Sequence, residues 1–229
     1  MVFKIGHRGA CGYEPENTLL SFKKALELKV DMVECDVHVC KTKQVVVIHD
    51  TTVERTTNGS GKVKEKALEQ LKFLDAGKGE KIPTLEEVLD TVNCKAKVNI
   101  ELKGEGTAKP VYQIIEKYIK TKRWAYQDFL ISSFNVSQLQ QFYQFNRRVK
   151  IGVLIDGDPK GFDKWTEKVK AGSIHVRLPF VTRDFIQAAH KFGLKVFVWT
   201  VNDSKAIRKM KSMGVDGIFS DFPDRLIER

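Results

Sequence analysis

The sequence lacks any apolar run long enough to cross a membrane. Of its 229 residues 42% are hydrophobic, yet the longest apolar stretches, residues 45–48 and 196–199, are only strand-sized. A membrane-spanning helix needs roughly 18 or more such residues. Lys4, His7 and Arg8 also occupy N-terminal positions where a signal peptide would need its apolar core. We therefore expect a cytoplasmic protein that does not insert stably into membranes.

Cysteine is scarce as well. Cys11, Cys35, Cys40 and Cys94 form no CxxC pair and have no His-rich neighbourhood. This spacing argues against a zinc site, and we expect reduced, buried thiols in its place.

Acidic residues are fewer than basic ones. The sequence has 29 Asp and Glu but 39 Lys and Arg, which gives a net charge of +10. The lysines are scattered among acids, as in residues 62–66, which is typical of a solvated surface. A nucleic-acid-binding protein would interleave aromatic residues with Lys and Arg on one exposed face. The sequence shows no such stripe. We predict no nucleic-acid partner, and the composition indicates no particular oligomeric state.

Strand-like apolar runs alternate with helix-period segments along nearly the whole chain. Strands are predicted at residues 2–6, 32–39, 45–49, 97–102, 129–133, 149–155, 173–178, 195–201 and 217–220. Amphipathic helices are predicted at residues 18–28, 84–92, 108–121, 136–145, 162–170, 182–192 and 204–213. Three helices begin at good capping residues, namely Thr84 (with Glu87 three residues on), Thr182 and Ser204.

The repeating strand–helix units predict a parallel sheet closed into a barrel. Only five residues, 40–44, separate the second and third strands, which is too few for a parallel crossover, so these two must form an antiparallel hairpin. Removing that extra strand from the nine leaves the eight parallel strands of a TIM-type (β/α)8 barrel. A doubly wound open sheet is the alternative, but it would usually carry a glycine-rich phosphate loop after its first strand, and none is present.

Residues 50–83 fit no strand–helix unit. They are rich in Thr, Gly, Lys and Glu, with one short helical piece near residues 67–73. We predict a small insertion on the C-terminal face of the barrel, where barrel loops carry function. Because this insertion is short for an independent core, we expect residues 1–229 to form a single barrel domain.

Polar residues gather at the predicted C-terminal ends of the strands, where barrel active sites form. His7 and Arg8 end the first strand, while Glu34 and Asp36 lie two apart on the second and so point to one face. The other members of this group are His49, Asp50, Glu101 and Lys103. Carboxylates that point into a barrel are costly unless they are paired or bind a metal. The cluster therefore indicates a functional site.

The residue types in this cluster indicate phosphoryl transfer. Three carboxylates without a cysteine favour one hard divalent cation, Mg²⁺ in the first place and Ca²⁺ as the alternative. Two histidines can serve as general acid and general base near neutral pH. Arg8 and Lys103 suit an anionic oxygen. A metal, an acid–base pair and two cations together are the groups that phosphoryl transfer requires.

The ordered set of motifs resembles the glycerophosphodiester phosphodiesterase family over nearly the whole chain. The matching segments are His7-Arg8-Gly9, Pro15-Glu16-Asn17-Thr18, Glu34-Cys35-Asp36-Val37, His49-Asp50, Arg55-Thr56-Thr57, Glu101-Leu102-Lys103, Ser133-Phe134, Trp199-Thr200-Val201-Asn202 and Asp216-Gly217-Ile218-Phe219-Ser220-Asp221. Two departures, a hairpin turn at residues 41–44 without Asp-Gly and Lys29 in place of a usual glycine, leave the predicted chemistry untouched.

The resemblance implies metal-dependent hydrolysis of small anionic glycerophosphodiesters to an alcohol and glycerol 3-phosphate. It implies a metal ion on three carboxylates, Glu34, Asp36 and Glu101. It also implies that His7 and His49 form the acid–base pair and that Arg8 and Lys103 lie near the phosphate.

Two further residues have predicted substrate contacts, each with an open alternative. Asn17 either hydrogen-bonds in the active site or caps the helix that follows. Trp199 either contacts the glycerol at the barrel mouth or packs as a core tryptophan. The alternative function within the same fold is lysophospholipase D-type cleavage of lysophospholipids, which apolar residues on the mouth loops would favour.

Overall fold

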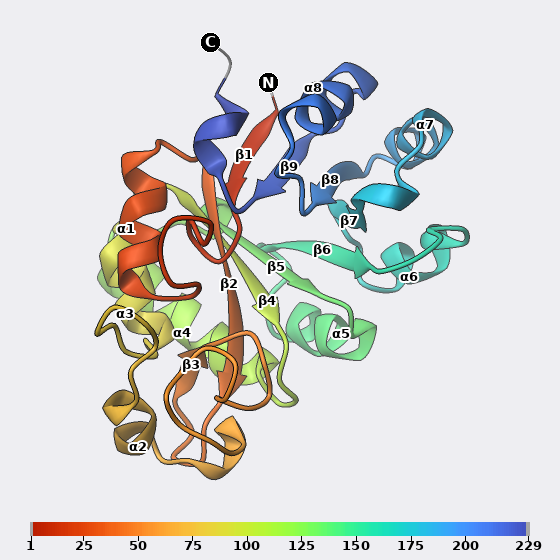
Figure 1. Cartoon of the computed structure of the whole chain (residues 1–229). Helices are drawn as coiled ribbons and strands as arrows, with labels where there is room; N and C mark the ends of the chain where they lie inside the picture. The colour runs from red at the N-terminus through yellow and green to blue at the C-terminus, as the bar shows by residue number, and fades with distance from the viewer. Residues whose placement is uncertain (1, 228–229) are drawn as a thin grey trace.

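The chain folds into a closed barrel of parallel β-strands, seen in a computed structural model that describes residues 2–227 (Figure 1). The eight barrel strands are β1 (Phe3–Gly6), β2 (Met32–Val39), β4 (Lys97–Leu102), β5 (Phe129–Ser133), β6 (Lys150–Ile155), β7 (Ser173–Arg177), β8 (Lys195–Trp199) and β9 (Gly217–Ser220). They pair in the order β1-β9-β8-β7-β6-β5-β4-β2, and β1 pairs with β2 to close the ring. The predicted TIM-type barrel is confirmed, and the open doubly wound sheet was the wrong alternative.

A ninth strand, β3 (Val45–Val47), lies outside the barrel. It pairs antiparallel with β2, with Val37 opposite Val47. The connecting turn is closed by the Cys40 N–H, which donates to the carbonyl oxygen of Gln44 at 3.0 Å. The predicted hairpin is confirmed, although β3 ends two residues before the predicted boundary at residue 49.

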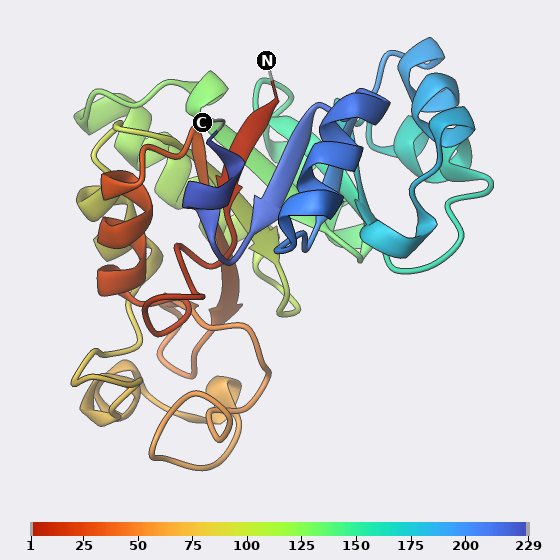
Figure 2. The same ribbon diagram turned by 45° about the horizontal axis from the view of Figure 1, so that its top comes forward.

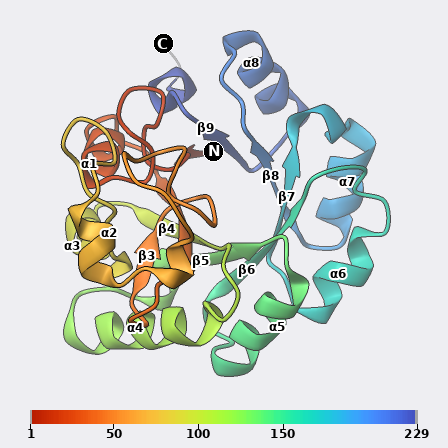
Figure 3. The same ribbon diagram turned by 60° about the horizontal axis from the view of Figure 1, so that its bottom comes forward.

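The helices that connect the strands form an outer ring around the barrel (Figure 3). These helices are α1 (Leu19–Glu27), α3 (Leu85–Val92), α4 (Ala108–Thr121), α5 (Val136–Phe145), α6 (Phe162–Lys168), α7 (Arg183–Lys191) and α8 (Ser204–Met213). Each begins within one residue of its predicted start. None of the helices within residues 2–227 combines the length and the apolar composition that crossing a membrane requires.

Side-chain caps fix the starts of the three helices for which the sequence predicts a cap. Thr84 and Glu87 form the predicted capping box, with the Glu87 N–H donating to the Thr84 hydroxyl at 3.2 Å. Thr182 caps α7 as predicted. The prediction for α8 was wrong by one residue, because Asp203 is the cap and Ser204 is already helical. The Asp203 carboxylate reaches the N–H of the third helical residue, which leaves no capping role for the serine.

The alternation of side chains along the strands separates an outer apolar layer from a polar mouth. On β2, Val33, Cys35 and Val37 are fully buried in the layer between barrel and helices. Toward the N-terminal ends of the strands, a second apolar cluster is formed by Ile5, Met32, Leu130, Phe197 and Phe219. His175 packs within this cluster, with its ring centroid 5.0 Å from that of Phe197.

Residues 50–83 form an insertion at the C-terminal end of the barrel, opposite the end at which β1 begins (Figure 2). The insertion contains α2 (Leu68–Phe73) and packs against the hairpin. The apolar side chains of this contact are Cys40, Val46, Ile48, Val53, Val63, Leu71, Ala76 and Ile82. The insertion therefore lies on the face predicted from the sequence and next to the polar mouth.

The turn after β1 depends on Gly9, which has a φ of +88°. A Cβ there would lie 2.6 Å from the backbone carbonyl carbon of Ser21 in α1. This close approach lets the Ser21 hydroxyl donate to the carbonyl oxygen of Arg8 and accept from the N–H of Ala10, both at 2.9 Å. Contact between turn and helix thus fixes the segment that carries His7 and Arg8.

Replacing Gly9 with Ala should destabilise the protein more than the same change at Gly79. Both glycines have positive φ, but no atom lies within 4 Å of a Cβ built at Gly79. We expect Gly79→Ala to cost about 1 kcal/mol through backbone strain. Gly9→Ala should cost roughly 3 kcal/mol, because overpacking against α1 adds to that strain. Urea unfolding measures both losses, and equal losses would contradict the importance of the close approach.

Candidate active site

A cavity of about 320 Å³ opens at the C-terminal end of the barrel. Its lining comprises His7, Arg8, Glu34, His49, Asn99, Glu101, Lys103, Phe134, Leu154, Asp156, Trp199, Thr200 and Phe219. Every residue with a predicted role in the site lines this cavity except Asn17 and Asp36. These two are buried, with 3% and 1% of their surface exposed.

Three carboxylates meet at this cavity. β2 and β4 are neighbours, and their register places Asp36 directly beside Glu101. Glu34 lies two residues earlier on the same face of β2. One carboxylate oxygen of each lies within 4.8 Å of the others, and the residues are only 1–8% exposed. We call Glu34, Asp36 and Glu101 the carboxylate triad.

The triad is electrostatically strained in the absence of a cation. Burial, and then repulsion from Asp36 and Glu101, raises the pKa of Glu34 well above its ordinary value. Burial and Asp36 also raise the pKa of Glu101 to about 7, although Lys103 opposes the shift. Among the described residues, Oε1 of Glu101 is paired only with Lys103, at 3.1 Å. Three buried carboxylates this close together fit a hard divalent cation such as Mg²⁺ or Ca²⁺.

Two cationic side chains flank the triad. The backbone N–H of Arg8 donates to Glu34 at 2.8 Å, and its Nε lies 3.4 Å from an Asp36 oxygen without a hydrogen bond. Lys103 Nζ lies 3.1 Å from Glu101 Oε1 and 4.0 Å from Asp36. Both cations line the cavity, so they can also reach an anionic group placed inside it.

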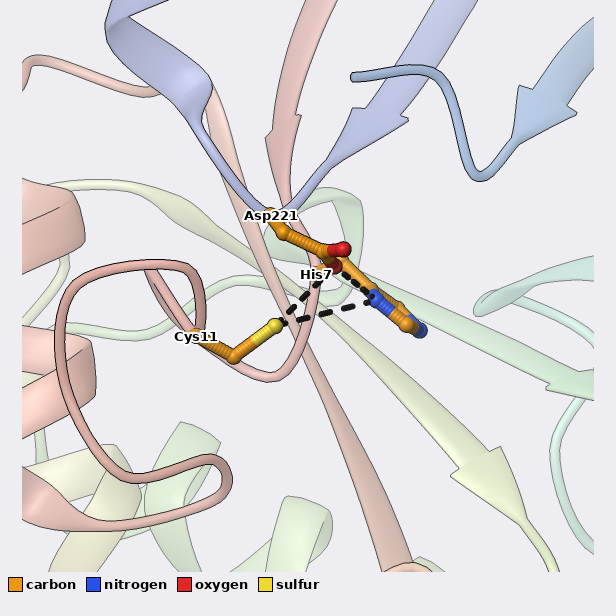
Figure 4. Close-up of side chains that lie close together, drawn as sticks. All are labelled: His7, Cys11 and Asp221. Atoms are coloured by element: carbon orange, nitrogen blue, oxygen red, sulfur yellow. Dashed lines mark hydrogen bonds and ion pairs between the residues drawn. The ribbon is translucent and has the colours of Figure 1, made fainter.

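The imidazole of His7 is held by a carboxylate from the far end of the chain (Figure 4). Its Nδ1 lies 2.6 Å from Asp221 Oδ1, and the Cys11 thiol donates to the same oxygen at 3.0 Å. Asn202 fixes the other oxygen of Asp221 with a hydrogen bond of 2.6 Å. Burial opposes ionisation of Asp221, but the hydrogen bonds from His7 and Cys11 outweigh it and hold its pKa well below the usual range. An ionised Asp221 leaves only Nε2 of His7 for the cavity.

The imidazole of His49 is held in the same way, by Asp50. Its Nδ1 lies 2.5 Å from Asp50 Oδ1, and Arg55 of the insertion donates to Asp50 Oδ2 at 2.6 Å. Arg55 also donates two hydrogen bonds of 2.8 Å to Glu16, which accepts a third from Arg8. Burial lowers the pKa of His49, and the bonds from Arg55 hold the pKa of Asp50 well below its usual range. The insertion is thereby tied to both His49 and Arg8.

Asn17 contacts the triad and does not cap the helix. Its amide nitrogen donates to Asp36 Oδ2 at 2.9 Å, and its amide oxygen accepts from the Asp36 N–H at 3.3 Å. The cap of α1 is Thr18, which accepts from the N–H of Ser21 at 3.2 Å.

Trp199 lies at the barrel mouth with its ring near Phe134. The ring centroids are 5.6 Å apart in an edge-on arrangement, and Trp199 Nε1 donates to the carbonyl oxygen of His175 at 3.2 Å. Lys103 Nζ lies 5.5 Å from the centre of the Phe134 ring, which is 43% exposed. The two aromatic residues form an apolar wall beside the cationic groups.

Sequence reasoning assigned no role to the residues that hold the two histidines, Asp221, Asp50 and Arg55. Asp50 follows His49 directly, so a local pairing could have been foreseen. The pairing of His7 with Asp221 spans 214 positions and requires β1 and β9 to be neighbours. The signal available in the sequence was that the first and last predicted strands, β1 and β9, must be neighbours if the barrel is to close.

Comparison with known proteins finds a family that this chain matches over nearly its whole length. The sequence model of the Glycerophosphoryl diester phosphodiesterase family matches residues 7–225. A glycerophosphodiester phosphodiesterase from Caldanaerobacter subterraneus subsp. tengcongensis is 39% identical over 233 residues, which cover 97% of this chain and 95% of that protein. The family match spans every predicted site residue.

Solved structures show the same architecture. An Oleispira antarctica phosphodiesterase in complex with the product sn-glycerol-3-phosphate has a TM-score of 0.90 at 30% identity, covering 97% of this chain and 94% of that one. A glycerophosphodiester phosphodiesterase from Thermotoga maritima has a TM-score of 0.81 at 30% identity, covering 98% and 96%.

Proposed function

Because the chain belongs to the glycerophosphoryl diester phosphodiesterase family of phosphoric diester hydrolases, we propose that it cleaves glycerophosphodiesters to an alcohol and glycerol 3-phosphate with one divalent cation and two histidines. The observation that carries this proposal is the buried carboxylate triad, which opens into a cavity lined by two histidines and two cationic side chains. The product held by the Oleispira antarctica phosphodiesterase supports the choice of substrate.

The carboxylate triad would hold the cation. Its oxygen donors suit Mg²⁺ first and Ca²⁺ as the alternative, and one oxygen of each carboxylate lies within 4.8 Å of the others. When bound, the cation supplies positive charge to a phosphoryl oxygen and makes a nearby hydroxyl more acidic. Asn17 orients Asp36 by two hydrogen bonds, which is how we propose it acts on the site.

Arg8 and Lys103 bind the phosphate in this proposal. Each of these side chains pairs with a carboxylate of the triad, and a divalent cation bound there would neutralise the triad's negative charge in their place. The two side chains would then be free to donate to anionic phosphate oxygens, which Arg does with a planar pair of N–H groups. Trp199 and Phe134 would pack against the glycerol carbons.

The two histidines move protons at Nε2. Asp221 and Asp50 keep a proton on Nδ1 of His7 and His49, so each Nε2 faces the cavity as an acid or a base. One histidine takes the proton of the attacking hydroxyl, and the other gives a proton to the departing alcohol oxygen. Their paired carboxylates stabilise the imidazolium form that each passes through.

The attacking oxygen comes from the substrate in this proposal. Cys11 is the thiol beside His7, but it does not line the cavity, and burial raises its pKa so that it stays protonated. The glycerol 2-hydroxyl lies close to the phosphorus and gains the rate advantage of a group already in place. Its oxygen bonds to phosphorus as the bond to the alcohol breaks. Water then opens the cyclic phosphate to glycerol 3-phosphate.

An assay with glycerophosphocholine tests the function directly. We expect release of glycerol 3-phosphate, loss of activity in excess chelator, and recovery when Mg²⁺ or Ca²⁺ is restored. Lysophosphatidylcholine, run in parallel, should be cleaved more slowly, because the cavity holds only about 320 Å³. Full activity in chelator would rule out the metal, and an analogue without the 2-hydroxyl that turns over normally would rule out the cyclic route.

Replacement of His7 or His49 with Ala should lower kcat by roughly 10²- to 10⁴-fold, the usual size of general acid–base catalysis. Neither residue belongs to the triad, so metal affinity and the urea midpoint should change little. His190→Ala is a matched control, since His190 also pairs with a carboxylate (Asp216, at 2.8 Å) but does not line the cavity. If either variant keeps near wild-type kcat, that histidine does not transfer a proton.

A further inference from the structure

A second group of metal-ligating atoms lies on the Nδ1 side of the His7 ring, formed by His7, Cys11 and Asp221. Within residues 2–227, it is the one such group besides the carboxylate triad. Figure 4 shows the Cys11 thiol and the Asp221 carboxylate pointing toward the same ring nitrogen. The three atoms are His7 Nδ1, Cys11 Sγ and Asp221 Oδ1, and all lie within 4.8 Å of one another.

We propose that these three atoms form a second metal site, for a thiophilic divalent cation such as Zn²⁺, and that the cation bound there inhibits the enzyme. Zn²⁺ prefers this mixture of imidazole nitrogen, thiolate sulfur and carboxylate oxygen, often with three protein ligands and one open position. Mg²⁺ and Ca²⁺ prefer oxygen alone and so do not compete for the site. The site stands on its own geometry, whereas the inhibition rests on the function proposed for His7.

The geometry needs only small adjustments to hold the ion. Nδ1 and Oδ1 are 2.6 Å apart, Sγ and Oδ1 are 3.0 Å apart, and Sγ and Nδ1 are 3.9 Å apart. Tetrahedral Zn²⁺ with normal bond lengths sets such ligands roughly 3.4–3.6 Å apart. The His7–Asp221 and Cys11–Asp221 pairs therefore have to open, and the Cys11–His7 pair has to close, each by less than about 1 Å.

The carboxylate is already oriented as a ligand. Asn202 donates to Oδ2 of Asp221 at 2.6 Å and accepts from its backbone N–H at 2.9 Å, so Oδ1 is left for the ion. Such outer hydrogen bonds are what orient the ligands of metal sites. The side chains of His7 and Asp221 are 19% and 26% exposed, which gives a hydrated ion a route to the site.

Binding requires one proton to leave the protein. Burial, and then Asp221, raises the pKa of the Cys11 thiol, so the free protein carries that proton. When the ion binds, the sulfur–metal bond forms and the thiol proton passes to solvent. The two charges of the ion then balance one thiolate and one carboxylate, which leaves the site neutral.

The bound ion would disable His7 without touching the triad. For Nδ1 to share its lone pair with the metal, the ring proton that Asp221 holds on Nδ1 leaves that nitrogen, and Nε2 takes up a proton, so the neutral ring changes tautomer without a net loss of protons. An Nε2 that already carries its proton cannot accept another. It also releases that proton far less readily than an imidazolium does. The proposed acid–base role of His7 is lost while the triad keeps its own cation.

Calorimetric titration of Zn²⁺ into the enzyme, with Mg²⁺ saturating, tests the site. Wild type should bind one Zn²⁺ per chain. Cys11→Ser should bind it at least 10- to 100-fold more weakly, since loss of a ligand should exceed loss of an outer partner. Cys94→Ser, which removes an exposed thiol elsewhere, should bind as wild type does.

Activity measured in the same samples tests the inhibition. Zn²⁺ should inhibit wild type and Cys94→Ser but spare Cys11→Ser, when the activity of each protein with Zn²⁺ is compared with its own activity without Zn²⁺. Equal Zn²⁺ affinity in wild type and Cys11→Ser would overturn the site. So would loss of Zn²⁺ binding in Glu34→Gln with Cys11→Ser unaffected, since Zn²⁺ would then occupy the triad. An enzyme inactive on every glycerophosphodiester would refute the proposed function, and calorimetry would still decide the site.

Discussion

The repulsion among three buried carboxylates determines which charged groups the barrel mouth requires. The parallel register of β2 and β4 sets Asp36 beside Glu101, with Glu34 two residues away. Burial raises the pKa of both glutamates. Burying three carboxylates this completely costs folding free energy unless nearby positive charge offsets their negative charge. Arg8 offsets part of the charge, but a divalent cation would do so more fully. A cation bound to the triad, together with Arg8 and Lys103, would suit the cavity to a phosphate.

The two histidines depend on a second set of carboxylates that no substrate needs to touch. Closure of the barrel between β1 and β9 brings Asp221 to His7. The insertion orients His49 indirectly. Its Arg55 donates a hydrogen bond to Asp50, and Asp50 in turn holds the imidazole of His49. Each imidazole therefore presents one nitrogen to the cavity and keeps the other against an acid. The same closure completes the group of His7 Nδ1, the Cys11 thiol and Asp221, where we propose that a bound Zn²⁺ inhibits the enzyme.

Much of the fold follows from the sequence, because periodicity of two or 3.6 residues marks nearly every strand and helix. The five-residue connection required the hairpin, and the spacing of Glu34 and Asp36 placed both on one face. Contacts between segments far apart in the sequence could not be predicted from these local patterns. The cysteine spacing argued against zinc because it records only neighbours in sequence, whereas Cys11 meets Asp221 across 210 positions. Local competition also misled, as when Asp203 rather than the adjacent Ser204 capped α8.

The most direct test of the carboxylate triad is the number of protons released when Mg²⁺ or Ca²⁺ binds. With a pKa of about 7 for Glu101, the metal-free triad is partly protonated at pH 7, and a cation must expel that proton. Calorimetry in buffers of different ionisation enthalpy counts the protons released. We predict one ion per chain and a proton release that is greater below pH 7 than well above it. Glu34→Gln should weaken the binding sharply. Binding without proton release, or undiminished in Glu34→Gln, would contradict the triad as the metal site.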